Sequence, residues 1–162
     1  MSDLAEFSDF YEVHASKVLR SVVAATGRAD SAEDATAEAF QRAWATWSRL
    51  RKHPAPAAWV AVTASNLVRD DWRKHQRGLR LLPKAATTEA VTDSPPIDQQ
   101  LLACISNLPP RQREVIALRI LLDQSAEQTA TALGITAGSV GTHLSRALAA
   151  LRAELSPTQN QD

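Results

Sequence analysis

Cysteine, aromatic residues and long apolar runs are scarce in this chain of 162 residues. Its one cysteine, Cys104, excludes an internal disulfide and a multi-cysteine metal site, and it fits a reducing compartment. Because Cys104 lies among Leu101, Leu102 and Ile105, we expect a buried, unreactive thiol. No apolar run approaches the ~18 residues of a membrane span. The acidic start MSDLAEFSDFYEVH has no basic segment, so we expect a cytoplasmic protein without a signal peptide or membrane insertion.

The sequence also lacks the patterns of a catalytic site. The four histidines, His14, His53, His75 and His143, are far apart and show neither metal-ligand nor triad spacing. No glycine-rich phosphate loop is present in the sequence. We therefore predict that the protein is not an enzyme and uses no cofactor or metal.

The net charge of zero conceals an uneven distribution along the chain. Residues 1–50 carry five Lys/Arg against eight Asp/Glu, and residues 51–84 carry eight against two. Residues 111–162 balance five against five. An acidic first part suits a basic partner, and a basic middle suits phosphates.

Apolar residues recur at helical spacing, and neither strand-like alternation nor an internal repeat is present. We predict an all-α fold of two small helical domains, residues 1–80 and 97–155, the second with a helix-turn-helix. The stretch LLPKAATTEAVTDSPP lacks periodicity, so we expect a flexible linker at 81–96. A disordered tail is expected at 156–162. The expected helices cover about 7–27, 30–50, 57–76, 97–106, 110–121, 125–132 and 136–154.

The stretch SAEQTATALGITAGSVGTHLSRALAALR, residues 125–152, has the features of two helices joined by a tight turn. Gly134 lies where a first helix ends in a left-handed conformation, and Ile135 fills the corner. Thr136 can cap a second helix through its hydroxyl. This spacing predicts a helix-turn-helix whose second helix can enter a major groove; a plain helical hairpin is the alternative.

Three stretches, in this order, resemble a bacterial sigma factor of the extracytoplasmic-function (ECF) group in the sigma-70 family. SAEDATAEAFQRAWATW resembles the helix with which these factors hold core RNA polymerase, and PAAWVAVTASNLVRDDWRKHQR resembles their promoter −10 segment. LPPRQREVIALRILLDQSAEQTATALGITAGSVGTHLSRALAALR resembles their −35-binding domain. The resemblance covers about residues 7–78 and 97–155.

The resemblance implies a transcription initiation factor that binds core RNA polymerase, recognises −35 and −10 promoter DNA and promotes DNA melting. Many members are restrained by an anti-sigma protein, which is therefore a candidate partner. By resemblance, an acidic and partly aromatic helix face docks on the polymerase, although a solvated face is the alternative and Trp44 could belong to the core. The residues chosen for this contact are Asp34, Glu38, Gln41 and Trp44.

Opening a promoter requires cations for phosphates and an amide for base edges. The residues predicted for −10 DNA are Asn66, Arg69, Arg73, Lys74 and Arg77. By resemblance, Asn66 and the loop at 51–59 lie where the family captures the −10 strand. We expect Trp59 and Trp72 to be core residues, and Asp70 and Asp71 to pair with nearby arginines.

A recognition helix reads base edges near its amino-terminal end, and arginines elsewhere hold the phosphates. The residues predicted for −35 DNA are Arg111, Arg113, Arg119, Thr136, Ser139, Thr142, His143 and Arg146. Many members of the family carry Lys or Arg where this chain has Gly141, so we predict weak −35 affinity outside the holoenzyme. An operator-binding helix-turn-helix regulator is the rival interpretation, but it explains only residues 97–155.

Overall fold

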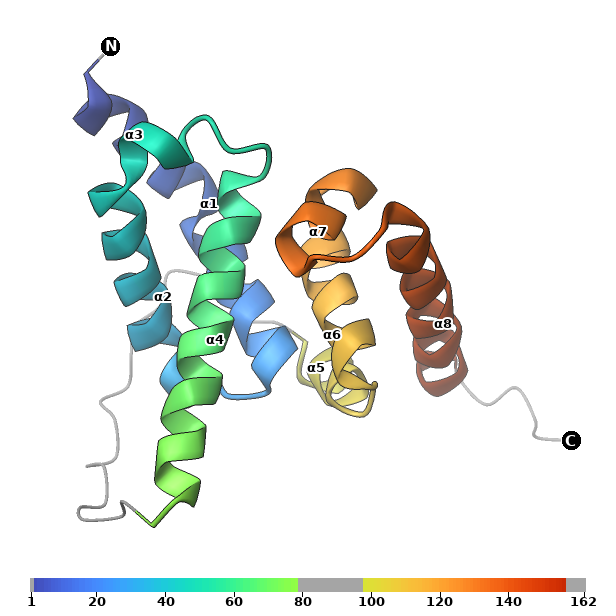
Figure 1. The fold of residues 1–162 in the computed structure, drawn as a ribbon. Coiled ribbons are helices and arrows are strands. Elements are labelled where there is room, and N and C mark those ends of the chain that lie inside the picture. The colour runs from blue at the N-terminus through green and yellow to red at the C-terminus, as the bar shows by residue number, and fades with distance from the viewer. Residues whose placement is uncertain (1, 79–97, 157–162) are drawn as a thin grey trace, which may run out of the picture.

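The computed structural model describes residues 2–78 and 98–156, and these ranges contain helices and no strand (Figure 1). The expected all-α architecture is confirmed for these ranges. The predicted linker at 81–96 and the tail from residue 157 lie outside the described residues.

The first described range forms the N-terminal module, which consists of α1 (Asp3–Thr26), α2 (Ala29–Ala45), α3 (Trp47–Leu50) and α4 (Pro56–Gln76). Helix α1 begins four residues earlier than predicted, because the Ser2 hydroxyl accepts a hydrogen bond from the Ala5 amide at 3.2 Å and caps it. The helix predicted for 30–50 is interrupted at Thr46. There φ is −114° and the backbone leaves the α region before α3 begins.

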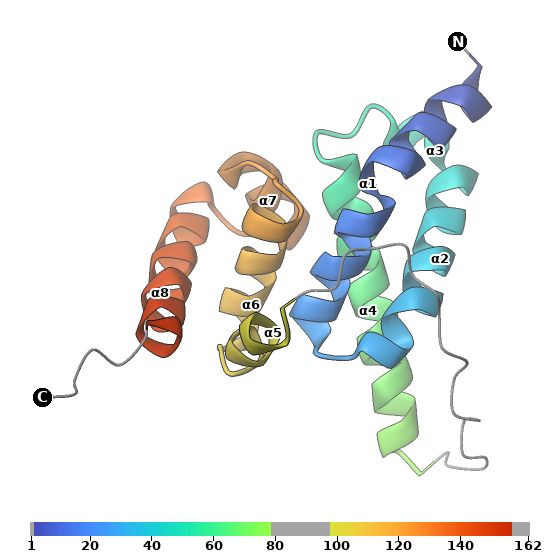
Figure 2. The ribbon, with the colours of Figure 1, turned by 180° about the vertical axis from the view of Figure 1, so that it is seen from behind.

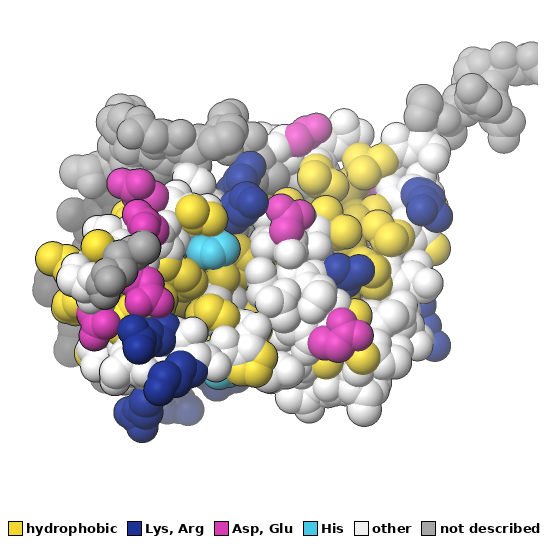
Figure 3. Space-filling model, turned by 90° about the horizontal axis from the view of Figure 1, so that it is seen from above, with side chains coloured by type: hydrophobic (Ala, Val, Ile, Leu, Met, Phe, Trp, Pro, Cys, Tyr) yellow, Lys and Arg dark blue, Asp and Glu magenta, His cyan; other side chains and the backbone are white. Residues whose placement is uncertain are grey.

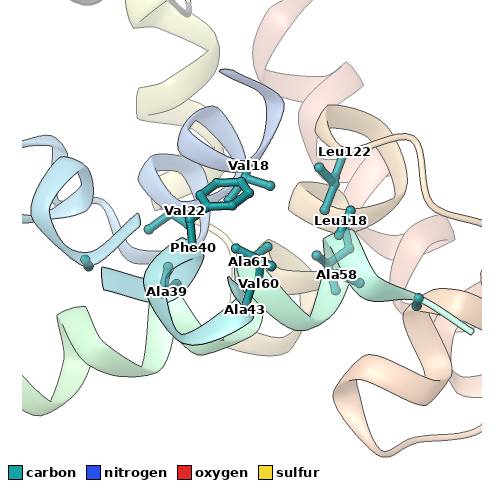
Figure 4. Close-up of a cluster of buried hydrophobic side chains, with 14 of the residues drawn as sticks. Val18, Val22, Ala39, Phe40, Ala43, Ala58, Val60, Ala61, Leu118 and Leu122 are labelled. Carbon is teal, nitrogen blue, oxygen red and sulfur yellow. The ribbon is translucent and has the colours of Figure 1, made fainter. Parts of the chain in front are cut away.

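Small side chains allow the helices of this module to pack closely. Ala39 and Ala43 of α2 face Val60 and Ala61 of α4, and Val22 of α1 closes the cluster (Figure 4). All five side chains are buried. Close packing of complementary side chains gives a protein interior its density, so the relative positions of α2 and α4 are tightly defined.

The second described range forms the C-terminal module: α5 (Gln99–Ser106), α6 (Pro110–Ile116), the π-helical turn η1 (Ala117–Leu121), α7 (Ala126–Leu133) and α8 (Ala137–Leu155). In the π turn, the amide of Leu122 donates to the carbonyl of Ala117 at 3.1 Å, across five residues. Cys104 is buried as expected, with 6% of its surface exposed. A hydrogen bond with Glu154 raises the pKa of its thiol, in agreement with an unreactive role.

The predicted helix-turn-helix is confirmed. Gly134 ends α7 with φ of 68°, the left-handed conformation that favours glycine. The Thr136 hydroxyl accepts from the Ser139 amide at 3.0 Å and caps α8. Ile135 packs with Val140 in the corner between the two helices. The turn therefore follows from residues that are close together in the sequence.

The two modules are in contact, and α1 packs against both (Figures 1 and 2). Leu118 and Leu122, with 3% and 2% of their surfaces exposed, belong to the same buried cluster as Val18 of α1. Ala24 and Ala25, nearer the end of α1, are buried with residues of the C-terminal module. Within the described ranges, no helix combines the length and the apolar character needed to cross a membrane.

Candidate functional site

The four residues predicted to bind polymerase share the outer surface of α2, and all four are exposed. Glu38 forms an ion pair with Arg42 one helical turn later, at 3.0 Å. Trp44 is 44% exposed, and its ring centroid lies 5.3 Å from that of Phe7 on α1. Trp44 is therefore a surface residue supported by the α1 aromatics, and the alternative that places it in the core is wrong.

A groove of about 430 Å³ separates this surface of α2 from α4. Asp34 and Glu38 line it on one side, and Asp70, Asp71 and Lys74 line it on the other. These four carboxylates outnumber the two cations that line the groove, Arg42 and Lys74, so the groove is acidic. The structure thus brings Lys74, predicted to bind −10 DNA, close to two residues predicted to bind polymerase.

The last turns of α4 present the cations predicted for −10 DNA. Arg73, Lys74 and Arg77 are exposed. Asp70 pairs with Arg73 at 3.7 Å, as expected from the sequence. The carboxylate of Asp71 lies 3.9 Å from the His75 ring, and its pairing with an arginine stays a prediction.

The sequence predicts a core position for Trp72, and this prediction is wrong. Its side chain is 40% exposed, and the Arg28 guanidinium lies over the ring, 4.7 Å from its centroid. The apolar spacing along α4 suggested a core position, but α4 extends beyond the bundle there. Trp59, by contrast, packs against the core as expected. The exposed ring is a surface on which an unpaired base can stack.

Asn66 and Arg69 lie at the boundary between the modules, around a cavity of about 290 Å³. One guanidinium nitrogen of Arg69 lies 3.0 Å from the Glu114 carboxylate on α6, and the other donates to the Asn66 side chain at 3.5 Å. Arg111 donates to the same carboxylate at 2.9 Å. Glu114 therefore joins a residue predicted for −10 DNA to one predicted for −35 DNA. Sequence reasoning missed Glu114, because only the docked modules bring these groups together.

The loop between α3 and α4 is held from both modules. Arg51 pairs with Asp3 at 3.3 Å and with Glu6 at 3.2 Å, both on α1. The Gln128 side-chain amide on α7 donates to the Pro54 carbonyl at 3.2 Å. Figure 3 shows acidic and basic side chains gathered side by side on the N-terminal module at this end of the molecule. The loop thus has a defined position at the start of α4.

On α8, Thr136, Thr142 and Arg146 are exposed, and Ser139 and His143 are half-buried. The Thr142 hydroxyl donates to the Gly138 carbonyl at 3.2 Å. An added Cβ at Gly141 would meet no atom within 4 Å, so larger side chains fit there. The amino-terminal half of α8 is therefore an accessible surface of small and polar groups.

Arg113 and Arg119 donate to backbone carbonyls of their own module. Arg113 reaches the carbonyl of Leu108 at 3.1 Å, and Arg119 reaches that of Gln124 at 2.6 Å. These contacts support the turns that flank α6 and η1. The phosphate contacts predicted for these two arginines stay predictions. No group of three or more His, Cys, Asp or Glu side chains that could hold a metal occurs within 2–78 and 98–156.

Comparison with known proteins agrees with this division of the chain. The family model described as "Sigma-70 region 2" matches residues 10–78, and "Sigma-70, region 4" matches residues 98–151. The RNA polymerase sigma-E factor of Streptomyces coelicolor is 31% identical over 163 residues, which cover 96% of this chain and 89% of that protein. The ECF RNA polymerase sigma factor SigL of Mycobacterium tuberculosis is 31% identical over 155 residues, covering 90% of this chain and 86% of SigL.

Among solved structures, the fold is similar to the sigma factor RpoE of Bartonella quintana, crystallised in complex with the anti-sigma factor NepR. The TM-score is 0.73 at 21% identity, and the match covers 95% of this chain and 99% of RpoE. The two matched sigma-70 regions and the relatives at 31% identity show that this chain belongs to the sigma-70 family, as a sigma factor of the ECF group.

Proposed function

We propose that this sigma factor binds core RNA polymerase through α2, reads −10 DNA with α4 and the preceding loop, reads −35 DNA with α8, and helps to open the duplex. It performs no catalysis of its own and works in the cytoplasm. The observation that carries the proposal is that three separate exposed surfaces on one chain have the chemistry of these three tasks.

The polymerase contact is supported by the character of the α2 surface. Asp34 and Glu38 supply negative charge, and Trp44 supplies an exposed aromatic ring beside them. Complementary charge accelerates and orients protein association, and a large aromatic side chain gives much of the affinity. This combination suits a partner surface that is basic and partly apolar.

The −10 contact is supported by the end of α4. Arg73, Lys74 and Arg77 are exposed cations that can neutralise phosphates, and the Trp72 ring offers a stacking surface. The Asn66 amide can donate to and accept from a base edge. Together these groups can hold an unpaired strand after its bases have left the stack.

The −35 contact is supported by the helix-turn-helix. Thr136 and Thr142 are exposed at the amino-terminal end of α8, so their side chains can reach base edges in a major groove. Arg146 lies farther along the same helix, where a phosphate contact is expected. Because Gly141 adds no cation to this half of α8, specific affinity for −35 DNA alone should be weak.

A pull-down with purified core RNA polymerase tests the polymerase contact. The unmodified chain should bind, and the double variant D34K/E38K should lose binding because both charges face the partner. The matched control D9K/E12K changes the same charge on the exposed surface of α1 and should bind normally. Failure of the unmodified chain to bind, or equal loss in both variants, would contradict the assignment of α2.

We also propose an anti-sigma protein as a partner. RpoE of Bartonella quintana forms a complex with one, and both proteins have the same fold. Purification of the tagged chain from its native cells should recover a second protein that competes with core polymerase. A recovered protein that leaves polymerase binding unchanged would contradict this role.

A further inference from the structure

The turn between α1 and α2 holds Arg28 beside the end of α4 (Figure 1). Gly27 ends α1 with φ of 71°, in the left-handed region. The Thr26 hydroxyl accepts from the Arg28 amide at 3.3 Å and donates to the Val22 carbonyl at 2.7 Å. The backbone at Arg28 is therefore fixed to α1, and the half-buried side chain extends over Trp72.

The Arg28 guanidinium keeps its capacity to bind an anion. Its centre lies 4.7 Å from the centroid of the Trp72 ring. A cation–π contact leaves the N–H donors at the edge of the guanidinium plane open to an acceptor. Within residues 2–78 and 98–156, no carboxylate pairs with Arg28, whereas Asp70 pairs with Arg73 at 3.7 Å. Arg28 is therefore available to a phosphate although it already contacts a ring.

The Trp72 ring stays accessible beside this cation. With Arg28 in place, 40% of the Trp72 surface is exposed, because α4 extends there beyond the bundle. A flat aromatic ring stacks on a nucleobase, and every base has such a face. In a duplex the bases stack on each other, so an unpaired strand is the form that offers these faces to a protein. A ring and a cation in contact thus match the two parts of one unpaired nucleotide, its base and its phosphate.

We propose that Arg28 and Trp72 together bind one unpaired nucleotide of promoter DNA: the indole ring stacks on the base, and the guanidinium binds the adjoining phosphate. This inference rests on the proposed function, because it requires α4 to lie along the −10 strand. It adds the turn between α1 and α2 to that DNA surface. Trp72 lies about 24 Å along α4 from the first residue of this helix, Pro56, at about 1.5 Å per residue. The site therefore holds a different nucleotide from the one assigned to the loop before α4.

The test uses the full chain and a short single-stranded DNA of mixed sequence. Fluorescence anisotropy at a series of salt concentrations gives the affinity and its salt dependence, and tryptophan emission reports the stacking of a base on an indole ring. R28Q removes the cation, R28K keeps a positive charge, and W72L removes the stacking ring. The matched control R152Q removes an exposed arginine near the end of α8. Circular dichroism verifies that every chain folds.

We expect R28Q to flatten the slope of log K against log salt by about 0.7, the share of one phosphate contact on a single strand. R28K and R152Q should keep the slope of the unmodified chain. W72L should also keep the slope, but it should bind at least about fivefold more weakly and lose part of the emission change. A strand of equal length without bases should bind W72L and the unmodified chain equally, because it offers phosphates and nothing to stack.

A salt slope for R28Q equal to that of R152Q would overturn the phosphate contact, and an undiminished emission change in W72L would overturn the stacking. Failure of the unmodified chain to bind the strand at low salt would overturn the site as a whole. R77Q separates this inference from the proposed function, because it removes a cation already assigned to −10 DNA. A flatter slope in R77Q alone counts against Arg28 and leaves the proposed function standing. Unchanged slopes in both variants count against the proposed −10 contact as well.

Discussion

The guanidinium of Arg28, in the turn between α1 and α2, lies over the ring of Trp72 on α4, 4.7 Å from its centroid. This contact connects the beginning of α2 to the part of α4 that carries the cations predicted for −10 DNA. The Arg28 guanidinium also covers one face of the exposed Trp72 indole ring. The pair therefore links the stability of the N-terminal module to the position of a stacking surface.

Replacing Arg28 by Gln should lower the free energy of unfolding by about 0.5–1 kcal/mol, the usual size of an exposed cation–π contact. Arg28→Lys keeps a cation and should lose less. Urea unfolding followed by circular dichroism measures both variants. If Gln at this position leaves the free energy of unfolding unchanged, the ring contact does not contribute to stability.

Gly141 offers a second direct test, because nothing obstructs a side chain there. Gly141→Ala should raise the free energy of unfolding by up to ~1 kcal/mol through helix propensity alone. Gly141→Arg should add a phosphate contact and raise duplex affinity, with the slope of log K against log salt steeper by about one. Salt titrations of −35 duplex binding compare the two variants. Equal slopes for Ala and Arg would show that position 141 does not approach the backbone.

The helix-turn-helix and the inter-module contacts differ in how far the sequence alone predicts them. Gly134 and Thr136 act on atoms within a few residues, so local spacing identifies both. Arg69 and Glu114 are 45 positions apart, and their pairing depends on how two modules dock. No local pattern contains that information.

The difference between local spacing and long-range packing also explains two wrong predictions, the core position of Trp72 and the unbroken helix at 30–50. Trp72 lies on an apolar stripe, but the bundle ends before it, and only the packed structure shows where a bundle ends. The interruption at Thr46 was missed because the apolar periodicity continues through Trp47 and Leu50. Spacing along the sequence thus predicts the helices, and long-range packing decides which of their side chains are buried.

Thr136 caps α8 and is also a predicted DNA contact, so its two roles need separate variants. Thr136→Ala should lower the free energy of unfolding by about 1 kcal/mol, because it removes the cap on the Ser139 amide. Thr136→Ser keeps the hydroxyl and should retain most of the stability. Thermal unfolding of both variants makes the comparison. Equal melting temperatures for Ala and Ser would contradict the capping role.

His14 makes the stability sensitive to acid. Burial lowers the pKa of His14 below its ordinary 6.5, and the nearby Lys17 charge adds to this effect. As the pH falls through 6.5, His14 therefore gains its proton in the unfolded chain before it does so in the folded chain. The free energy of unfolding should fall as the pH decreases through about 6.5.

Urea unfolding between about pH 7.5 and pH 5.5 measures this dependence. The variant His14→Gln lacks the titrating group and should lose less stability over the interval than the unmodified chain. Identical losses in the two chains would assign the acid sensitivity to other groups.

Transcription with purified core RNA polymerase on a library of genomic promoter fragments tests initiation most directly. Addition of the chain should start transcripts whose upstream DNA shares two short sequence elements, spaced for α4 and α8 of one molecule. If no template yields a transcript that depends on the chain, it does not act as an initiation factor.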